Sequence, residues 1–223
     1  MARRSQSLPE EVASYVRELI LTGELRPGEF LRLEPIAAAV GVSNTPVREG
    51  LLALRSEGFV RLVPRRGFMV ESLSRRDVKD IFWAQAKLAG ELAARAAKVI
   101  TAKQVDELDE LRQAWEAAVD SGDEERIAEA GHRFHRYINL LADSSRLAGI
   151  LGSIVQNLPN RFYATIEGHV EATRDDHRQM AEALRERNPR VARRLVEEHI
   201  LETGDHLVEV LDRRGLWGRE NTA

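Results

Sequence analysis

The fold of the N-terminal part is decided by residues 41–51, which read GVSNTPVREGL. Gly41 ends a short helix predicted from Pro35 to Val40. Ser43 stands at the N-cap of a second helix, which has Pro46 in its first turn. An apolar stripe at helical spacing follows, formed by Val47, Leu51 and Leu54. Two helices separated by a tight glycine turn indicate a helix-turn-helix.

Segments on either side complete a small domain. A helix is predicted from Leu8 to Thr22, with a capping box at residues 7–10. Extended segments are predicted at 30–33, 59–63 and 67–70. The last two flank a basic turn at 64–66 and form a hairpin, the wing. Residues 1–73 are therefore predicted to form a winged helix-turn-helix with a small β-hairpin wing.

Residues 74–223 change to a pattern of long helices with almost no strand signal. Helices are predicted near 74–98, 102–120, 123–142, 145–167, 172–187 and 189–213. Thr101 and Gln104 form a second capping box, and Asn188 with Pro189 starts the last helix. The predicted fold class is mainly α: a winged helix-turn-helix followed by an all-α antiparallel helical bundle.

Composition excludes several kinds of protein. The chain of 223 residues has no cysteine, so disulfides, thiolate metal sites and cysteine nucleophiles are ruled out. No apolar run approaches the roughly 20 residues that cross a bilayer, and residues 1–9 lack the apolar segment of a signal peptide. A cytoplasmic protein with no membrane partner is expected. The net charge of −3 argues against binding nucleic acid through bulk charge alone.

The second helix of a helix-turn-helix enters the major groove, so its first turns meet the base edges. The side chains expected there are Ser43, Asn44, Thr45 and Arg48. Arginine pairs with guanine and asparagine with adenine, while short hydroxyls at a helix N-terminus bind phosphate. The tip of the wing carries Arg65, Arg66 and Gly67, suited to phosphates or the minor groove.

A structural alternative exists for each of these residues. Ser43 and Thr45 can serve only as helix caps, and Arg48 can pair with Glu49 or Glu57 on a solvated surface. The order of helix, turn, helix and basic wing favours double-stranded DNA as the partner. Because one recognition helix covers few bases, a homodimer on a palindromic operator is expected.

The sequence resembles the GntR family of bacterial regulators in residues 41–51, 57–60 and 64–70. Its all-helical remainder is similar to the FadR-type, FCD-like ligand-binding domain. The resemblance implies a transcriptional regulator controlled by a small-molecule effector, such as a small organic acid. Arg48 matches an arginine of the family motif. Asn44 and Glu34 stand where members commonly have arginine, so no operator sequence can be carried over.

Three histidines lie on the apolar sides of separate predicted helices. They are His135, His177 and His199. One such histidine is usually a core residue with a local hydrogen-bond partner, but three can converge on one divalent ion. The resemblance implies a metal site, because metal-binding FadR-type members use Asp-x-x-x-His and two later histidines. Here the aspartate position is Gly131, and His132 is expected to point away from that face. The expected cofactor is therefore zinc or nickel, with one ligand missing.

The expected effector-binding residues match the family pattern less completely than the histidines do. The helix at residues 80–91 resembles a family helix that often carries arginine where this chain has Gln85, and glutamate where it has Ala89. Gln85 cannot clamp a carboxylate as arginine does, which leaves Arg161 or the metal for that task. Gln85 and Arg161 are the candidate effector-binding residues.

Two functions of other classes stay open. Three histidines with open coordination positions also suit a metal-dependent hydrolase. That hypothesis is weaker, because no HExxH or comparable motif supplies a catalytic acid or base. A helical adaptor whose winged module binds protein is the other alternative. We expect no catalytic residues.

Overall fold

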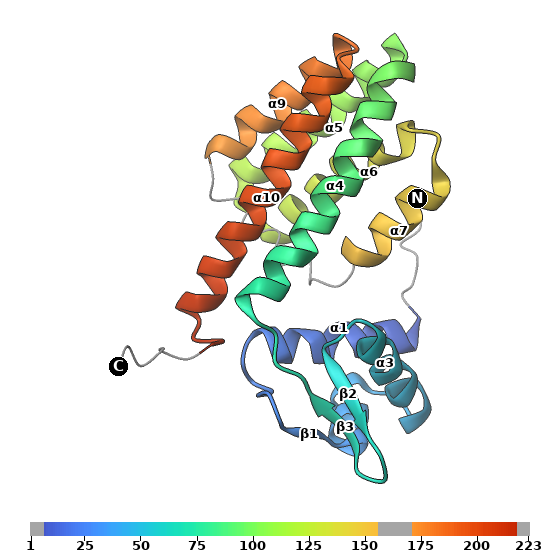
Figure 1. The fold of residues 1–223 in the computed structure, drawn as a ribbon, viewed down its shortest axis with the longest axis vertical. Coiled ribbons are helices and arrows are strands. Elements are labelled where there is room, and N and C mark those ends of the chain that lie inside the picture. Colours follow the sequence, from blue (N-terminus) through green and yellow to red (C-terminus); the bar gives the residue numbers. More distant parts are fainter. Residues whose placement is uncertain (1–6, 156–170, 218–223) are drawn as a thin grey trace. The chain divides into compact units, whose positions relative to one another are not determined.

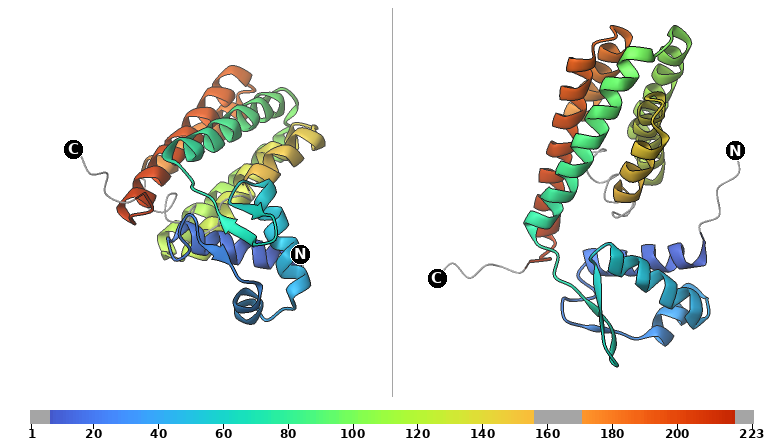
Figure 2. Two further views of the ribbon diagram at one scale, coloured as in Figure 1. Left: turned by 60° about the horizontal axis from the view of Figure 1, so that its bottom comes forward. Right: turned by 45° about the vertical axis from the view of Figure 1, so that its right-hand side comes forward.

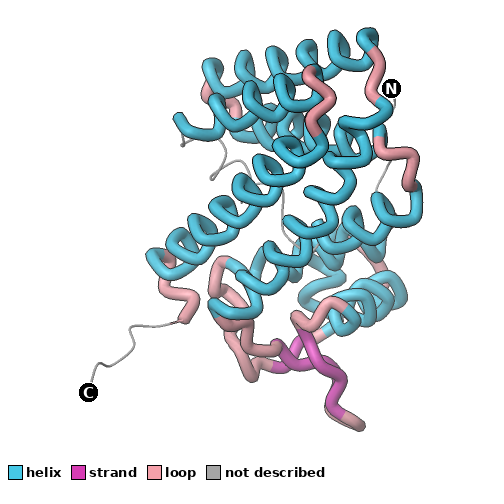
Figure 3. Tube along the Cα trace, turned by 45° about the horizontal axis from the view of Figure 1, so that its top comes forward, coloured by secondary structure: helices cyan, strands magenta, loops and turns pink. Residues whose placement is uncertain are grey.

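A computed structural model describes residues 7–155 and 171–217 (Figure 1). The chain divides into two compact units. The first contains the described residues up to Arg75 and those from Glu209 onward, and the second spans residues 76–208. Strands occur only in the first unit within the described residues, and helices make up the second (Figure 3). None of the described helices is long and apolar enough to cross a membrane.

The first unit is a winged helix-turn-helix, as predicted. Its elements are α1 (Leu8–Leu21), β1 (Phe30–Leu31), α2 (Leu33–Val40), α3 (Asn44–Ser56), β2 (Val60–Val63) and β3 (Gly67–Val70). The strands form an antiparallel sheet in the order β1-β3-β2, so β1 adds a third strand to the predicted hairpin. Gly41 follows α2 with φ 78°, a left-handed conformation that suits glycine and sets the turn into α3.

Two local predictions need correction. Ser7 and Ser43 stand at N-cap positions, but neither side chain makes a capping hydrogen bond. The second or third helical residue should donate that bond, and Pro9 and Pro46 occupy one such position in each helix without an N–H. The helix predicted from Pro35 also begins earlier, at Leu33. Pro35 in the first turn of this helix removes no intrahelical hydrogen bond, because the N–H groups of a first turn have no intrahelical partner.

The core of the first unit lies between α1 and α3. Val12 and Val16 of α1 and Leu51 and Leu54 of α3 are fully buried. Gly50 lets the helices approach closely, because a Cβ there would lie 2.6 Å from the backbone oxygen of Pro9. The packing of α3 on α1 therefore depends on a glycine in a helix interior, where glycine is otherwise unfavourable.

The second unit is the predicted antiparallel helical bundle. Its helices are α4 (Arg75–Val99), α5 (Ala102–Ser121), α6 (Glu124–Leu141), α7 (Ser145–Val155), α9 (Glu171–Arg185) and α10 (Pro189–Arg213). The first and last of these continue beyond the unit's bounds. The described bounds agree with prediction to within two residues, and the predicted capping box of Thr101 and Gln104 is formed. The predicted helix at 145–167 is described only to Val155.

Helices α4 and α10 run side by side in both views of Figure 2. A Cβ on Gly204 of α10 would lie 2.6 Å from the side chain of Phe82 on α4, so the two helices touch at this point. Lys87 and Glu197 form an ion pair across the same interface. The largest fully buried side chains of the bundle include Phe82, Trp115 and Phe134. These large side chains surround the interior in which the histidines lie.

Candidate functional site

The first turn of α3 presents polar side chains to solvent. Ser43, Asn44, Thr45 and Arg48 are all exposed. Pro46 and Val47 are buried between them and fix the turn to the core. The side chains predicted to meet base edges thus lie on one open helix end, where the backbone N–H groups also favour phosphate.

A buried ion pair holds the far end of α3 against α1. The Arg17 guanidinium donates to Glu57 at 2.6 and 3.2 Å, and its side chain is 8% exposed. It also lies 5.7 Å from the ring centroid of Phe59. Glu57 therefore pairs with Arg17, which removes Glu57 but not Glu49 from the structural alternative for Arg48. Arg17 and Glu57 lie 40 residues apart, so local spacing gave no sign of the pair.

The wing tip has a strained backbone and two exposed arginines. Arg65 has φ 63°, unusual for a residue with a side chain, and Gly67 follows with φ 97°. The Arg66 N–H donates to the Val63 carbonyl at 3.0 Å and closes the turn. The Arg66 guanidinium lies 4.2 Å from the ring centroid of Phe30. Arg66 therefore packs on β1 as well as facing solvent.

The three predicted histidines meet inside the bundle. His135 of α6, His177 of α9 and His199 of α10 each offer a ring nitrogen, and these atoms all lie within 4.8 Å of one another. The Nε2 atoms of His135 and His177 are 3.3 Å apart. His177 and His199 are buried, and His135 is half-buried. Side chains from three helices thus converge on one point.

Neighbouring groups fix the orientation of the rings. His199 Nδ1 lies 3.0 Å from Asp176 Oδ2, which leaves Nε2 as the other ring donor atom. The His177 ring is packed against Trp115 and Phe134, with ring centroids 4.4 and 4.5 Å away. His177 Nδ1 is buried without a hydrogen-bond partner in the described part of the chain. Asp176 can therefore position His199 in the way that carboxylates position metal-binding histidines.

His135 and His177 are held in their neutral form. Burial lowers the pKa of His135 and of His177 well below the usual value, and the neighbouring histidines lower both further. For His177, the positive charge of Arg112 acts in the same direction. Neutral imidazole is the form that binds a metal ion, so these two rings need no deprotonation near neutral pH.

A cavity opens beside the cluster, lined by residues of α4, α6, α7 and α10 that include His135 and His199. Gln85, a predicted effector-binding residue, lines it and is 3% exposed. His132 also lines it, which corrects the prediction that this side chain points away. Three residues of helix turn by about 300°, so His132 and His135 project only about 60° apart. The other predicted effector residue, Arg161, lies outside the described residues.

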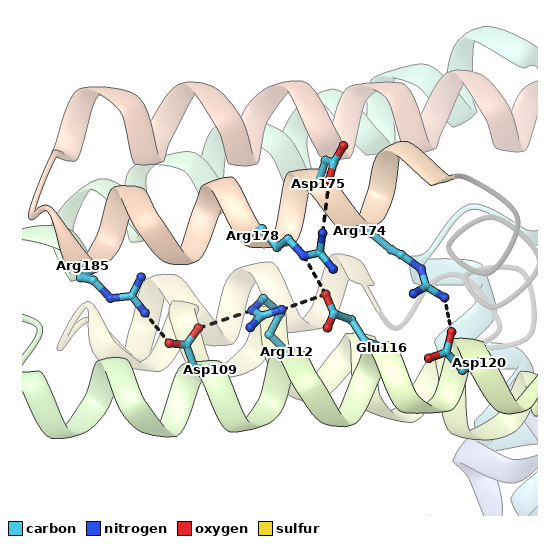
Figure 4. A network of polar contacts seen from close by, with 8 residues as sticks. All are labelled: Asp109, Arg112, Glu116, Asp120, Arg174, Asp175, Arg178 and Arg185. Atoms are coloured by element: carbon cyan, nitrogen blue, oxygen red, sulfur yellow. Dashed lines mark hydrogen bonds and ion pairs between the residues drawn. The ribbon is translucent and has the colours of Figure 1, made fainter.

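Ion pairs join α9, which carries His177, to α5 (Figure 4). Glu116 accepts from Arg112 at 2.8 Å and from Arg178 at 3.0 Å. Asp109 pairs with Arg112 and with Arg185, and Asp120 pairs with Arg174. We call this set the α5–α9 network. Because α9 is tied along its length, the position of His177 depends on these contacts.

Sequence reasoning missed three parts of the site. Asp176 directly precedes His177, but its contact with His199 crosses between two helices. His132 lies at the cavity wall, and its direction follows from the helical turn counted from His135 and not from Gly131. The α5–α9 network joins residues 54 to 76 positions apart, apart from its pairs within one helix. Charged residues at helical spacing are usually solvated, so the sequence carried no signal for it.

Comparison with known proteins identifies both units. The family model described as "Bacterial regulatory proteins, gntR family" matches residues 8–70, and the FCD domain model matches residues 80–202. The chain belongs to the GntR family. Its second unit contains an FCD domain, which includes all three clustered histidines. This GntR protein is therefore a DNA-binding transcriptional regulator with an effector-binding domain.

Two relatives that align with this GntR chain over nearly their whole length are transcriptional regulators. It is 23% identical over 209 residues to YdhC of Bacillus subtilis, an HTH-type transcriptional regulator, covering 92% of each chain. It is 22% identical over 219 residues to RspR of Escherichia coli, an HTH-type transcriptional repressor, covering 97% of this chain and 96% of RspR. The family and these relatives are transcriptional regulators and not enzymes, so the hydrolase hypothesis is set aside.

Solved structures show the same fold. E. coli McbR/YncC aligns with a TM-score of 0.68 at 22% identity, covering 92% of this chain and 98% of McbR. A structure described as a putative GntR transcriptional regulator from Rhodococcus sp. RHA1 aligns with a TM-score of 0.61 at 19% identity, covering 92% and 99%. The winged helix-turn-helix followed by a helical domain is therefore the fold of this GntR regulator.

Proposed function

We propose that this regulator binds a palindromic operator as a homodimer in the bacterial cytoplasm. Residues 1–73 form the DNA-binding domain, and residues 74–223 form the domain for effector, metal and dimerisation. The observation that carries the proposal is the exposed first turn of α3, in which buried Pro46 and Val47 fix the polar side chains in place. Two such turns related by two-fold symmetry would read two half-sites about one helical turn apart, or a multiple of it.

Base reading and phosphate binding are assigned to different residues. Arg48 and Asn44 are proposed to contact base edges, with Ser43 and Thr45 contacting phosphate at the helix N-terminus. Arg65, Arg66 and Gly67 of the wing are proposed to contact phosphates or the minor groove. Glu57 pairs with Arg17, so the base-reading role of Arg48 gains support.

His135, His177 and His199 are proposed to bind one divalent transition metal, zinc or nickel. Two nitrogens on one tetrahedral zinc lie about 3.3 to 3.4 Å apart, given Zn–N bonds of about 2.0 to 2.1 Å. The Nε2 atoms of His135 and His177 are 3.3 Å apart. The lowered pKa values keep both rings neutral, and Asp176 orients His199. The residues present therefore fit a transition metal.

Gly131 provides no side chain at the position where other metal-binding members have aspartate. When bound, the metal would supply a Lewis acid that can take an oxygen of the effector. The cavity beside the histidines is where the effector is proposed to bind, with Gln85 at its wall. Arg161 stays a predicted effector-binding residue.

Fluorescence anisotropy with genomic DNA fragments tests DNA binding. We expect salt-sensitive, sequence-specific binding to a duplex, with two chains per palindrome by native mass spectrometry. Equal affinity for every fragment would contradict the proposal.

Elemental analysis of protein purified without a metal-affinity tag tests the metal site. We expect about one equivalent per chain for the native protein and a large loss for His177→Ala. His206→Ala is the matched control, because His206 lies on α10 outside the cluster. Metal content that is equal in the native protein and His177→Ala would contradict the site.

A further inference from the structure

The cavity beside the histidines is mostly apolar. Its wall includes Phe82 from α4, Ile138 from α6, Leu151 from α7 and Val196 from α10. Every helix that borders it thus supplies at least one large apolar side chain. An apolar wall with a few polar groups favours a ligand whose body is apolar and whose polar atoms lie at one end.

The polar side chains of the wall are uncharged amides, a hydroxyl and imidazoles. Gln85, Asn139 and Thr203 are the neutral ones apart from the histidines. None of the described residues that line the cavity is a lysine, arginine, aspartate or glutamate. Against these described residues, a second charged group on a ligand would be buried without a countercharge, which is strongly unfavourable.

One donor on this wall lacks a partner. Gln85 is 3% exposed, and its Nε2 atom is buried without a hydrogen bond in the described structure. A buried N–H group without an acceptor is destabilising, so the site is improved by any ligand that brings an oxygen to it. Gln85 on α4 therefore marks where a ligand's acceptor atom belongs.

We propose that the cavity takes a small molecule with an apolar body and a single carbonyl-containing head group. The head-group oxygen accepts a hydrogen bond from Gln85 Nε2, and the body packs on the apolar wall. Among the described residues of the wall, no charged side chain can pair with the second group of a dicarboxylate or of an amino acid, so a single head group is favoured. This inference rests on the proposed effector function of the same cavity.

Matched probes on the full-length protein test the ligand class. Hexanoate and hexanamide share an apolar chain and a carbonyl oxygen, whereas adipate adds a second carboxylate to the same chain length. We expect hexanoate, hexanamide or both to bind in isothermal titration calorimetry and to raise the melting temperature, and adipate to do neither. Comparison of hexanoate with hexanamide distinguishes an acidic head group from a neutral one. Binding of adipate, or binding of neither monofunctional probe, would overturn the proposal.

Two substitutions test the role of Gln85. Gln85→Leu keeps the volume and removes the donor, so the affinity for the monofunctional probes should fall about five- to tenfold, the effect of one neutral hydrogen bond. Gln85→Glu should abolish hexanoate binding by charge repulsion. It should retain any hexanamide binding, because the introduced carboxylate accepts from the probe's amide N–H. Unchanged affinities in both folded variants would overturn the assignment of Gln85.

Operator binding measured on the same samples separates this inference from the proposed function. If the native protein binds its operator and no monofunctional probe binds, only the ligand class is wrong. If it binds no DNA specifically, the proposed function is wrong as well. Far-ultraviolet circular dichroism of each variant shows whether a lost affinity reflects lost folding.

Discussion

Gly50 of α3 packs against the start of α1. Gly50→Ala would bring a Cβ to 2.6 Å from the Pro9 carbonyl oxygen, which is backbone and cannot turn aside. We expect a loss of about 1–3 kcal/mol in the unfolding free energy of the winged domain, the usual effect of overpacking. Urea denaturation measures it.

Gly149→Ala on α7 is the matched control. No atom of the described residues lies within 4 Å of a Cβ there, and glycine in a helix interior is unfavourable, so this change should stabilise by about 0.5–1 kcal/mol. Opposite signs for the two substitutions indicate helix contact at Gly50. A stabilising Gly50→Ala would show that α1 shifts freely.

Arg48 carries the proposed base reading. Arg48→Ala should weaken operator binding by about 1–3 kcal/mol while leaving binding to random duplex nearly unchanged. Anisotropy titrations at one fixed salt concentration measure both affinities. Arg55→Ala, an exposed position later in the same helix, is the control. An equal loss on operator and random DNA would make Arg48 a phosphate contact.

The clustered histidines predict a pH dependence of stability in metal-free protein. The pKa values of His135 and His177 are lowered by folding, so the unfolded chain binds more protons than the folded chain below about pH 6.5. Their contribution to the free energy of unfolding is therefore fully present above that pH. It falls as the pH drops toward the pKa values of the two histidines in the folded state. Each histidine contributes up to about 1.4 kcal/mol per pH unit.

Urea denaturation in a chelator at pH 7.5, 6.5 and 5.5 measures the slope. His177→Gln removes one of the histidines whose pKa is lowered, so its stability should depend less steeply on pH than that of the native chain. The comparison uses slopes, because the substitution also changes the absolute stability. Identical slopes would mean that folding does not lower the pKa of His177.

At the scale of elements, the α5–α9 network determines how α9 presents His177. The side chains of Arg112 and Glu116 are 16% and 18% exposed, so their interactions are less screened than surface pairs. Glu116→Gln removes the negative charge that Arg112 and Arg178 share, and we expect a loss of about 1–2 kcal/mol in the free energy of unfolding. Zinc affinity should fall as well, because α9 is less firmly held.

Asp175→Asn supplies the control for that prediction. Asp175 also pairs with Arg178, but at 3.7 Å and with 71% of its side chain exposed, so its removal should change stability little. A double-mutant cycle between Glu116→Gln and Arg178→Gln isolates the pair across the two helices. A coupling energy near zero would assign the network to the solvated surface.

Element types were predictable because their signals are local. Helical spacing, the turn glycine Gly41 and the Thr101 capping box each act within a few residues. The exact start of α2 could not be predicted, because the conformational preference of Arg32 does not show whether it ends a strand or precedes a helix. Pairing of β1 with β3 also depends on a contact between distant segments.

The candidate sites were predictable to a different degree. Apolar stripes indicated the three histidines, and the family resemblance grouped them. Contacts that cross between helices carry no sequence period, so Asp176 on His199 and Arg17 on Glu57 emerged only from the fold. The direction of His132 follows from local geometry, because three residues of helix place it about 60° from His135.

At the scale of the whole molecule, regulation is a coupling free energy between the DNA-binding and effector-binding domains. Coupling of binding free energies is reciprocal. A ligand that changes operator affinity by some factor must therefore have its own affinity changed by operator DNA by the same factor. Titrations of both kinds on one preparation provide this check without any assumption about how the domains are arranged.

The proposed dimer makes a further prediction about salt. Each neutralised phosphate contributes about 0.9 to the slope of log affinity against log salt, so one wing contact in each of two chains contributes about 2. Arg65→Asn removes the charge and keeps a residue that tolerates the positive φ of 63° at this position. The slope on a palindromic operator should fall by about 2, with equal losses on operator and random DNA. A fall of about 1 would indicate one bound chain, and a loss confined to the operator would show that the wing reads bases.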